Sequence, residues 1–414
     1  MLDDATGAAS IGFVKQQIYM DYQATTPVDP RVLEVMLPYL QGRFGNAASG
    51  SHAFGWTAKA AVKNAREECA AILGAQPIDV IFTSGSTEGI NLAIKGAAES
   101  VGGGAGHLIT CVTEHPAVID VARDLEAKGT RVTWLPVDEQ GSIDLDALDA
   151  AFADDTFMVA LMAANNEIGT THPLREIGTR CRQRGVLFFC DGTQGVGKIP
   201  LDVVADHIDV LSWTAHKMYG PKGVGGLYVR NSDPHVRLAP LFHGGGHERG
   251  MRSGTLNVPG IVGFGEACRL AREELDEEFE RLTTLRRRLH EGIAAGLDGV
   301  SLNGAPERRL PGNLNLAFSW VDGEALMLDI RDVAVSSGSA CHSTNLEPSH
   351  VLRAIAVPDL ETSACIRFGL GRFTTEEEVD QVTGLVIAAV KRLRELSPRY
   401  ELARKRTDAV DAEE

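Results

Sequence analysis

Between about residues 60 and 230, short apolar runs alternate with amphipathic stretches, and this pattern leaves few folds open to the chain. The runs at residues 80–83, 107–110, 131–135, 157–162, 185–190 and 209–213 have the length and composition of buried strands. Between them, residues 91–98 and 116–127 have helical spacing. Alternating strands and helices predict an α/β fold with a mostly parallel sheet that helices cover on both faces.

The pattern changes near Ile261, where we predict one long helix whose apolar positions recur every three or four residues from 275 to 293. Residues 313–318 and 366–370 then alternate like half-buried strands, and residues 375–378 form a capping box that opens a helix ending near Leu396. We therefore expect a large domain at residues 31–264 and a smaller α+β domain at 265–400. Residues 1–30, too short to fold alone, are expected to pack with the small domain, and 401–414 to form a polar tail.

The composition describes an ordinary globular chain of 414 residues, with 44% hydrophobic and 23% charged residues. A net charge of −16 argues against binding to nucleic acid, whose phosphates it would repel. No apolar run is long enough to span a membrane, and the first residues resemble neither a secretory signal nor an Arg-rich transit peptide. We expect a cytoplasmic protein, or a protein of the mitochondrial matrix if a transit peptide has been removed.

A lysine and an aspartate follow two of the predicted strands. Lys217 enters a Gly/Pro-rich turn after strand 209–213, and an amine held in apolar surroundings can form a Schiff base. Asp191 ends strand 185–190, where a buried carboxylate needs a cationic or hydrogen-bonding partner. The pyridinium nitrogen of pyridoxal phosphate is such a partner. Taken singly, a solvated lysine and an aspartate that caps the next turn are the simpler interpretations.

Two further turns lie between a strand and a helix. Small and hydroxyl-bearing residues, among them Ser86 and Thr87, follow strand 80–83, and a helix start exposes backbone N–H groups to an anion such as phosphate. Thr214 can add a hydroxyl to the same group. His115 follows strand 107–110 and could stack on a cofactor ring or move a proton. Either turn could equally be a plain connection.

Cysteine usage singles out one thiol among seven. No pair is spaced as CxxC, so no metal site is expected, and six of the cysteines lie in apolar surroundings typical of core residues. Cys341 instead stands in the small, polar stretch 335–348, which suits an accessible nucleophile. His342 could assist its thiolate.

Together these motifs resemble the cysteine desulfurases of the iron–sulfur-cluster type, which belong to the class V branch of the fold type I pyridoxal-phosphate enzymes. The matching stretches are 19–27, 82–85, 165–169, 216–223, 244–255, 336–341 and 367–375, and the resemblance runs from Tyr19 to Leu396. It implies a seven-stranded sheet in the large domain and a homodimer. It also implies the roles of the site residues. Lys217 would hold the cofactor, Asp191 would contact its ring nitrogen, Gln194 its phenolic oxygen and His115 the ring face. The phosphate would be bound by Ser86, Thr87, Thr214 and His216, together with Thr255 of a second subunit, and the substrate by Asn166 and Arg367.

The resemblance further implies that L-cysteine is converted to L-alanine, that Lys217 moves the α-proton and that Cys341 keeps the sulfur as a persulfide. An iron–sulfur scaffold protein would then accept this sulfur. Three alternatives remain open: a class V aminotransferase, which has no use for Cys341, a selenocysteine lyase, and a non-catalytic homologue that binds a scaffold. The chain departs from the family pattern at Ala47, Gly50, Gly192, Gly195 and His342, and in its C-terminal tail.

Overall fold

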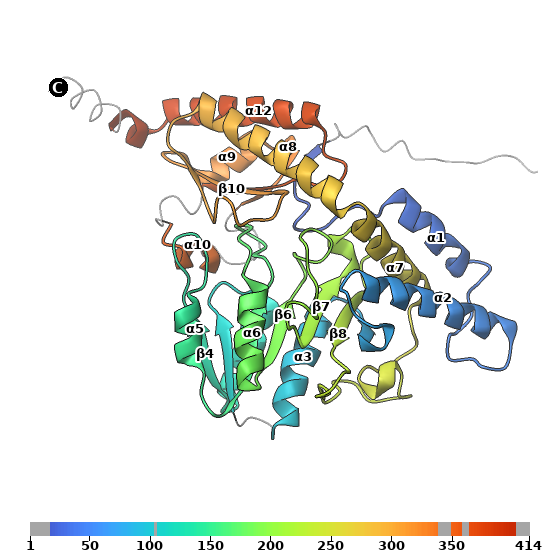
Figure 1. Ribbon diagram of the computed structural model, residues 1–414. Helices are drawn as coiled ribbons and strands as arrows, with labels where there is room; N and C mark the ends of the chain where they lie inside the picture. Colours follow the sequence, from blue (N-terminus) through green and yellow to red (C-terminus); the bar gives the residue numbers. More distant parts are fainter. Residues whose placement is uncertain (1–16, 103–105, 338–348, 358–363, 403–414) are drawn as a thin grey trace, which may run out of the picture.

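The computed structural model describes residues 17–102, 106–337, 349–357 and 364–402. Its helices are α1 (Pro30–Leu40), α2 (Ala53–Ala71), α3 (Ser86–Ser100), α4 (Pro116–Ala127), α5 (Leu145–Ala151), α6 (Leu174–Arg184), α7 (Val258–Glu273), α8 (Leu275–Gly296), α9 (Gly323–Asp329), α10 (His350–Ala354) and α12 (Glu376–Glu395), with short 3-10 turns η1 (Pro77–Asp79), η2 (Ala215–Lys217) and η3 (Glu248–Gly250). In Figure 1, α8, α9 and α12 lie together at the top of the view, above α3, α5 and α6.

Seven strands form the large sheet in the part of the chain that is described, in the spatial order β2-β8-β7-β6-β5-β3-β4. They are β2 (Val80–Thr83), β3 (His107–Cys111), β4 (Arg131–Leu135), β5 (Thr156–Met162), β6 (Leu187–Asp191), β7 (Val210–Thr214) and β8 (Gly225–Val229). Every neighbouring pair is parallel except those that include β8, which runs against both β2 and β7. The predicted α/β class is confirmed.

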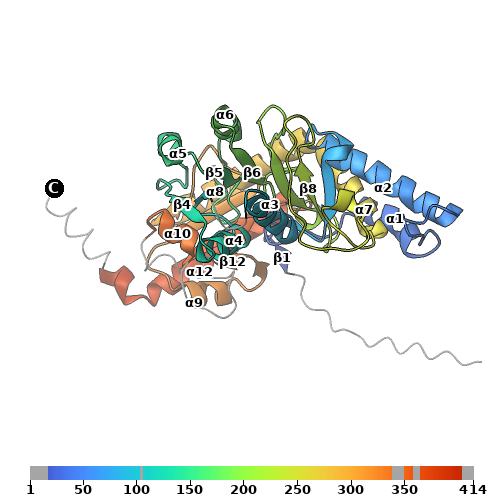
Figure 2. The ribbon, with the colours of Figure 1, turned by 90° about the horizontal axis from the view of Figure 1, so that it is seen from below.

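Helices cover both faces of this sheet, as Figure 2 shows from below. On one face, α3 and α4 pack against the strands and bury residues such as Ile94 and Val118. On the other, α2, α5, α6 and α7 bury Ala65, Leu148, Ile177 and Phe264. Because both faces are covered, a central strand such as β5 is apolar and buried along its whole length rather than alternating.

The second layer has a core of its own around a four-stranded antiparallel sheet ordered β12-β13-β10-β9. Its strands are β9 (Val300–Leu302), β10 (Asn313–Phe318), β12 (Ser336–Ser337) and β13 (Cys365–Gly369), and α8 and α12 pack over it. The predicted capping box is confirmed, since the Thr375 side chain accepts from Glu378 N while the Glu378 carboxylate accepts from Thr375 N. The start of the chain joins this layer: β1 (Ile18–Tyr19) pairs in parallel with β11 (Val333–Ala334), and Met20 enters the core.

Two details differ from the sequence-based expectations. The predicted single long helix is wrong, because the helical backbone breaks at Glu274, which ends α7 and precedes α8. At this break the Glu274 carboxylate pairs with Arg31 and Arg372, so the corner is tied to α1 and to the turn that follows β13. The short strand β8, rich in glycine, was also missing from the expected strands.

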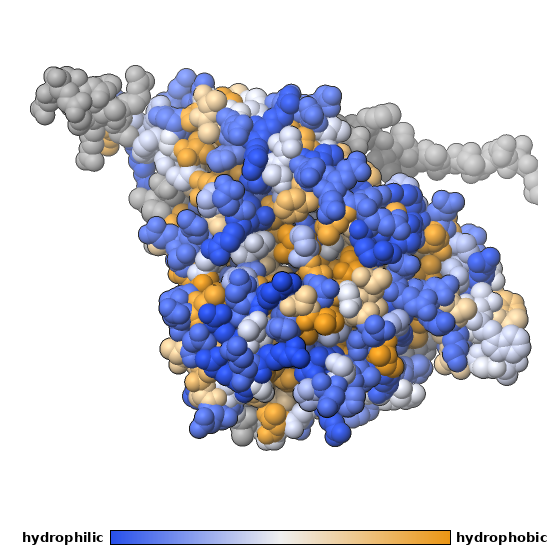
Figure 3. All heavy atoms as spheres, in the orientation of Figure 1, coloured by the Kyte–Doolittle hydropathy of each residue, from blue (hydrophilic) through white to orange (hydrophobic). Residues whose placement is uncertain are grey.

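Hydrophilic and hydrophobic residues are distributed unevenly over the surface of the molecule. In Figure 3 hydrophilic residues cover much of the face over α8 and α12, whereas hydrophobic residues gather near the middle of the view. No helix within the described ranges combines the length and the hydropathy that crossing a bilayer requires.

Candidate active site

A cavity of about 670 Å³ lies where the large sheet meets the small domain and the start of the chain. Its wall is built mainly from the carboxyl ends of β2, β3, β5, β6 and β7, the edge of a parallel sheet at which ligands bind. Most of the predicted site residues come together here: Ser86, Thr87, His115, Asn166, Asp191, Gln194, Thr214, His216, Lys217 and Arg367. Thr255 does not line the cavity and is exposed elsewhere, and Cys341 lies outside the described residues.

Asp191 ends β6 as a buried carboxylate, 4% exposed. Its Oδ1 accepts from the N–H of Thr193 at 3.0 Å, so it does cap the following turn. Within the described residues Oδ2 has no hydrogen bond of its own, and the residue lines the cavity. Burial, and then the charge of Asp191, raise the pKa of the neighbouring Glu114 carboxyl well above its ordinary value. A buried carboxylate in such a wall calls for a cationic or hydrogen-bonding partner inside the cavity.

Lys217 closes the 3-10 turn η2 directly after β7. Its Nζ donates to two carbonyl oxygens of the N-terminal segment, Gln23 O and Ala24 O, both at 2.6 Å. The amine is therefore held at the cavity by the chain start, which the small domain anchors through β1. Beside it, burial and then the charge of Lys217 lower the pKa of His216 to about 4, so this imidazole is neutral.

The turn between β2 and α3 presents an open helix N-terminus to the cavity. Gly85 precedes α3 with φ of 151°, a backbone conformation that side chains disfavour, and no side chain caps the helix there. Gly89 allows the helix to lie close to the sheet, since a Cβ would meet Ser212 Oγ at 2.4 Å. The free N–H groups and the hydroxyls of Ser86 and Thr87 make this turn suitable for an anion.

His115 is the N-cap of α4, where its Nδ1 accepts from Ala117 N at 3.1 Å. Because the acceptor nitrogen must be unprotonated, this bond favours the neutral ring with its proton on Nε2. Burial is the main cause that lowers the pKa of this ring, and His115 lines the cavity. His115 can thus present a neutral, flat imidazole to a bound ring.

Arg367 projects from β13 and is buried, with 6% of its side chain exposed. Its Nη1 donates to Asn166 O at 2.9 Å, and its Nη2 donates to Asp21 Oδ1 at 2.7 Å and to Ser336 Oγ at 2.9 Å. Its Nε is buried without a hydrogen-bond partner in the described part of the chain. Arg367 lines the cavity, and a guanidinium in that place suits a carboxylate ligand.

Sequence reasoning missed several residues of this wall, namely Asp21, Gln23, Thr193, Lys222 and Ser336. An acidic residue within the extended, aromatic-rich stretch 18–22 was the available signal for Asp21. The other residues carry no pattern of their own, because the fold brings their distant segments to one place.

Two of the departures from the family pattern have a packing explanation. A Cβ on Gly195 would meet Ala163 Cβ at 2.7 Å, and a Cβ on Gly192 would touch Leu211 and Val196 at 3.0 Å. Since real Cβ contacts are longer, the turn after Asp191 lies too close to its neighbours for larger residues. In this chain, glycine at both positions belongs to the local packing.

Comparisons with known proteins agree with this geometry. The model of the class-V aminotransferase family matches residues 18–382. The cysteine desulfurase IscS of Anaeromyxobacter sp. (strain Fw109-5) is 56% identical over 400 residues, which cover 97% of this chain and 99% of the relative. The solved structure of a NifS-like protein matches with a TM-score of 0.85 and 37% identity, and the match covers 91% of this chain and 100% of that one. The structure of SspA in complex with cysteine matches with a TM-score of 0.77 and 35% identity, and the match covers 86% of this chain and 100% of that one. The chain therefore belongs to the class-V aminotransferase family and, within it, to the cysteine desulfurases.

Proposed function

We propose that this protein is a pyridoxal-phosphate-dependent enzyme that converts L-cysteine to L-alanine and keeps the sulfur on Cys341. The observation that carries the proposal is the meeting of three unlike groups in one cavity: the amine of Lys217, the buried carboxylate of Asp191 and the open N-terminus of α3. Pyridoxal phosphate needs these three groups, one for its aldehyde, one for its ring nitrogen and one for its phosphate. The SspA structure with cysteine supports cysteine as the substrate.

The residues present fit this cofactor. The cavity volume, about 670 Å³, falls within the usual range for small-molecule sites. We assign the covalent link to Lys217, the ring nitrogen to Asp191, the phenolic oxygen to Gln194 and the ring face to His115. The phosphate is assigned to Ser86, Thr87, Thr214 and His216. When bound, the cofactor supplies an electron sink for the bonds that change in the substrate.

The chain's own residues then perform the remaining tasks. Arg367 and Asn166 bind the substrate carboxylate and orient the amino acid, and the Lys217 amine takes the α-proton and returns a proton to the alanine product. The thiolate of Cys341 attacks the substrate sulfur, so that a sulfur–sulfur bond forms while the carbon–sulfur bond breaks. Cysteine and one thiol thus yield alanine and one persulfide. The described residues that flank residues 338–348 support this assignment, since Ser336 lines the cavity and His350 donates to Glu114 O.

Cysteine turnover tests the proposal directly. Purified protein is incubated with L-cysteine and a dithiol, and alanine and sulfide are measured for the native protein, Cys341→Ser and Cys181→Ser. We expect equal amounts of alanine and sulfide from the native protein and from Cys181→Ser, whose buried thiol has a raised pKa and remains inert. Cys341→Ser should form no sulfide in repeated turnovers. Full sulfide release by Cys341→Ser would contradict the role of this thiol.

We also propose that the protein works as a homodimer through the outer face of α1 and α2, visible at the right of Figure 1. Large apolar side chains are exposed there: Leu33, Leu37, Leu40, Phe44, Phe54 and Trp56, the last of these 58% exposed. Large apolar side chains gathered on one exposed face are typical of a protein–protein contact site. Thr255 is exposed as well and is thereby available to a partner's phosphate site. Sedimentation should give a dimer for the native protein and a monomer for Leu40→Glu/Trp56→Glu, while an unchanged dimer would place the interface elsewhere.

An iron–sulfur scaffold is the sulfur acceptor that we propose, on the strength of the IscS relatives alone. Transfer of labelled sulfur from the loaded enzyme to a purified scaffold tests it, with Cys341→Ser as the unloaded control. We propose the cytoplasm or the mitochondrial matrix as the compartment, because the six described cysteines are buried free thiols that suit a reducing environment.

A further inference from the structure

A second lysine, Lys198, lies behind the wall that carries Lys217. Its Nζ donates to Gln194 Oε1 at 2.7 Å, and Gln194 Nε2 in turn donates to Gln23 O at 2.9 Å. The same carbonyl oxygen accepts from Lys217 Nζ at 2.6 Å. One amide and one carbonyl group therefore connect the two amines.

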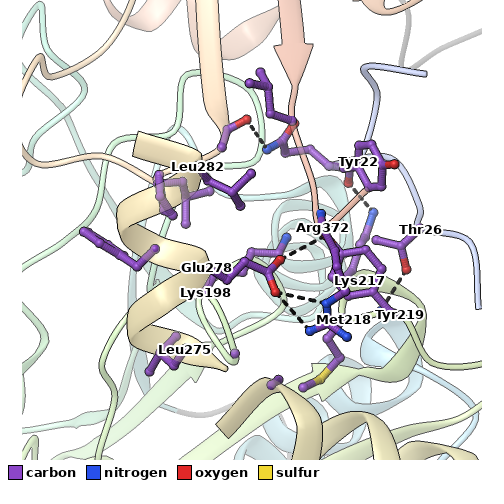
Figure 4. Close-up of a pocket in the computed structure, with 18 residues that line it drawn as sticks. Tyr22, Thr26, Lys198, Lys217, Met218, Tyr219, Leu275, Glu278, Leu282 and Arg372 are labelled. Carbon is purple, nitrogen blue, oxygen red and sulfur yellow. Dashed lines mark hydrogen bonds and ion pairs between the residues drawn. The ribbon is translucent and has the colours of Figure 1, made fainter. Parts of the chain in front are cut away.

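The space around Lys198 is a narrow cavity of about 30 Å³ between the two domains, shown in Figure 4. Leu275, Glu278 and Leu282 of α8 form one side, and Tyr22 and Thr26 of the chain start form the other. The titratable and charged groups that face Lys198 here are Lys217, Glu278, Tyr22, Tyr219, Arg367 and Arg372. Glu278, the acidic member of this set, is already bonded to Arg372 and to the Tyr219 hydroxyl.

Lys198 consequently has an unusual set of surroundings for a cation. No carboxylate of the described residues forms an ion pair with it, and its hydrogen bond goes to a neutral amide oxygen. Burial first, and then the positive charge of Lys217, lower the pKa of Lys198 to about 7, with Glu278 acting in the opposite direction. The group therefore changes its charge near neutral pH.

An ammonium group fixes the orientation of the amide to which it donates. It has no acceptor, so the oxygen of Gln194 must face Lys198 and the NH2 group must point the other way. Gln194 also lines the large cavity, so its donor end is the part available there. Gln23 O holds the same orientation from the other end of the amide, and loss of the ammonium group would remove one of these two restraints.

We propose that Lys198 is a positioning residue, which holds the Gln194 amide with its donor end toward the large cavity and places a positive charge behind Lys217. The inference rests on the proposed function, because the donor end would meet the phenolic oxygen of pyridoxal phosphate. The positive charge opposes protonation of the nitrogen that links Lys217 to the cofactor. Lys198 therefore keeps the pH midpoint of that nitrogen low.

The test is a pH titration of the visible absorbance of the cofactor-loaded protein, which changes when the linking nitrogen gains a proton. Native protein, Lys198→Met and Lys198→Arg are compared, since methionine keeps the length without the charge and arginine keeps charge and donors. We expect Lys198→Met to raise the midpoint by about one pH unit, as removal of a nearby charge should. The affinity for the cofactor should fall about 10-fold with the loss of one oriented hydrogen bond. Lys198→Arg should titrate close to the native protein below about pH 7, where both side chains carry a positive charge.

A double-mutant cycle with Gln194→Leu separates this role from a structural one. If Lys198 acts through the amide, the loss of cofactor affinity in Lys198→Met should be much smaller in the Gln194→Leu background. Should Lys198→Met fail to fold, Lys198→Gln provides the same comparison. An unchanged midpoint in the uncharged variants, with native absorbance and cysteine turnover intact, would overturn this inference and leave the proposed function standing. Native protein without the absorbance of a lysine-linked cofactor would overturn both.

Discussion

Replacing Arg367 by lysine should weaken substrate binding without slowing the chemical step. The guanidinium is held in place by Asn166 O, Asp21 and Ser336, at 2.7 to 2.9 Å. Lysine keeps one positive charge but loses the planar fork and the free Nε. A hydrogen bond to a charged group contributes about 1.5–3 kcal/mol, so the loss of one of the two bonds to a carboxylate corresponds to about 10- to 150-fold weaker binding.

The weaker substrate binding of Arg367→Lys should raise KM and leave kcat nearly unchanged. The substrate carboxylate keeps its charge throughout the reaction, so Arg367 binds the ground state and the transition state alike. Steady-state rates of alanine formation at varied L-cysteine separate the two constants. We expect KM to rise by about 10- to 150-fold, while kcat changes less than about threefold.

Arg394→Lys is the matched control. Arg394 is as buried as Arg367 and likewise donates three hydrogen bonds, one of them to a carboxylate, but it does not line the cavity. Its substitution should leave KM unchanged. A fall in kcat at constant KM for Arg367→Lys, or an equal rise of KM in the control, would refute the assignment of Arg367 to the carboxylate.

Three further results are expected. Asp191→Asn, which replaces the buried carboxylate by a neutral amide, should lower alanine formation by about 100-fold or more, and a rate near the native one would contradict its pairing with the ring nitrogen. Gly195→Ser, whose Cβ would meet Ala163 at 2.7 Å, should lower the free energy of unfolding in urea by about 1–3 kcal/mol, whereas Gly384→Ser, with no atom within 4 Å, should not. Burial lowers the pKa of His172 from 6.5 to about 4, so the unfolded chain takes up its proton first as the pH falls. Stability should therefore drop by up to about 3 kcal/mol between pH 6.5 and 4, and His172→Gln, measured by urea unfolding across this range, should lose that part of the pH dependence.

The strands of the large sheet could be predicted because burial on both faces leaves an unbroken apolar run. Residues 80–83, all four of them buried, form β2 with the predicted bounds, and residues 313–318 of the small sheet also keep the predicted bounds. β8 was missed because its two glycines weaken the strand signal, and the sheet tolerates them where Trp213 packs against Gly226. The break at Glu274 was missed because apolar spacing continues across it, and the arginines that pair with Glu274 there come from distant parts of the chain.

Some residues of the candidate site could be predicted from the sequence and others could not. Residues at strand ends, such as Lys217 and Asp191, could be proposed because parallel strands bring their carboxyl ends to one edge. Asp21 and Lys198 could not, since their roles depend on segments that come together only in the folded chain. The role of Cys341 remains a prediction from sequence, because the residue lies outside the described part of the structure.

The identity of the lysine that holds the cofactor is the most direct test, since Lys198 and Lys222 also border the two cavities. Borohydride reduction of the loaded protein makes the link permanent, and peptide mapping by mass spectrometry then locates it. The account predicts the pyridoxyl group on Lys217, with none on the other two lysines. A label on Lys198 or Lys222, or no labelled peptide, would contradict it.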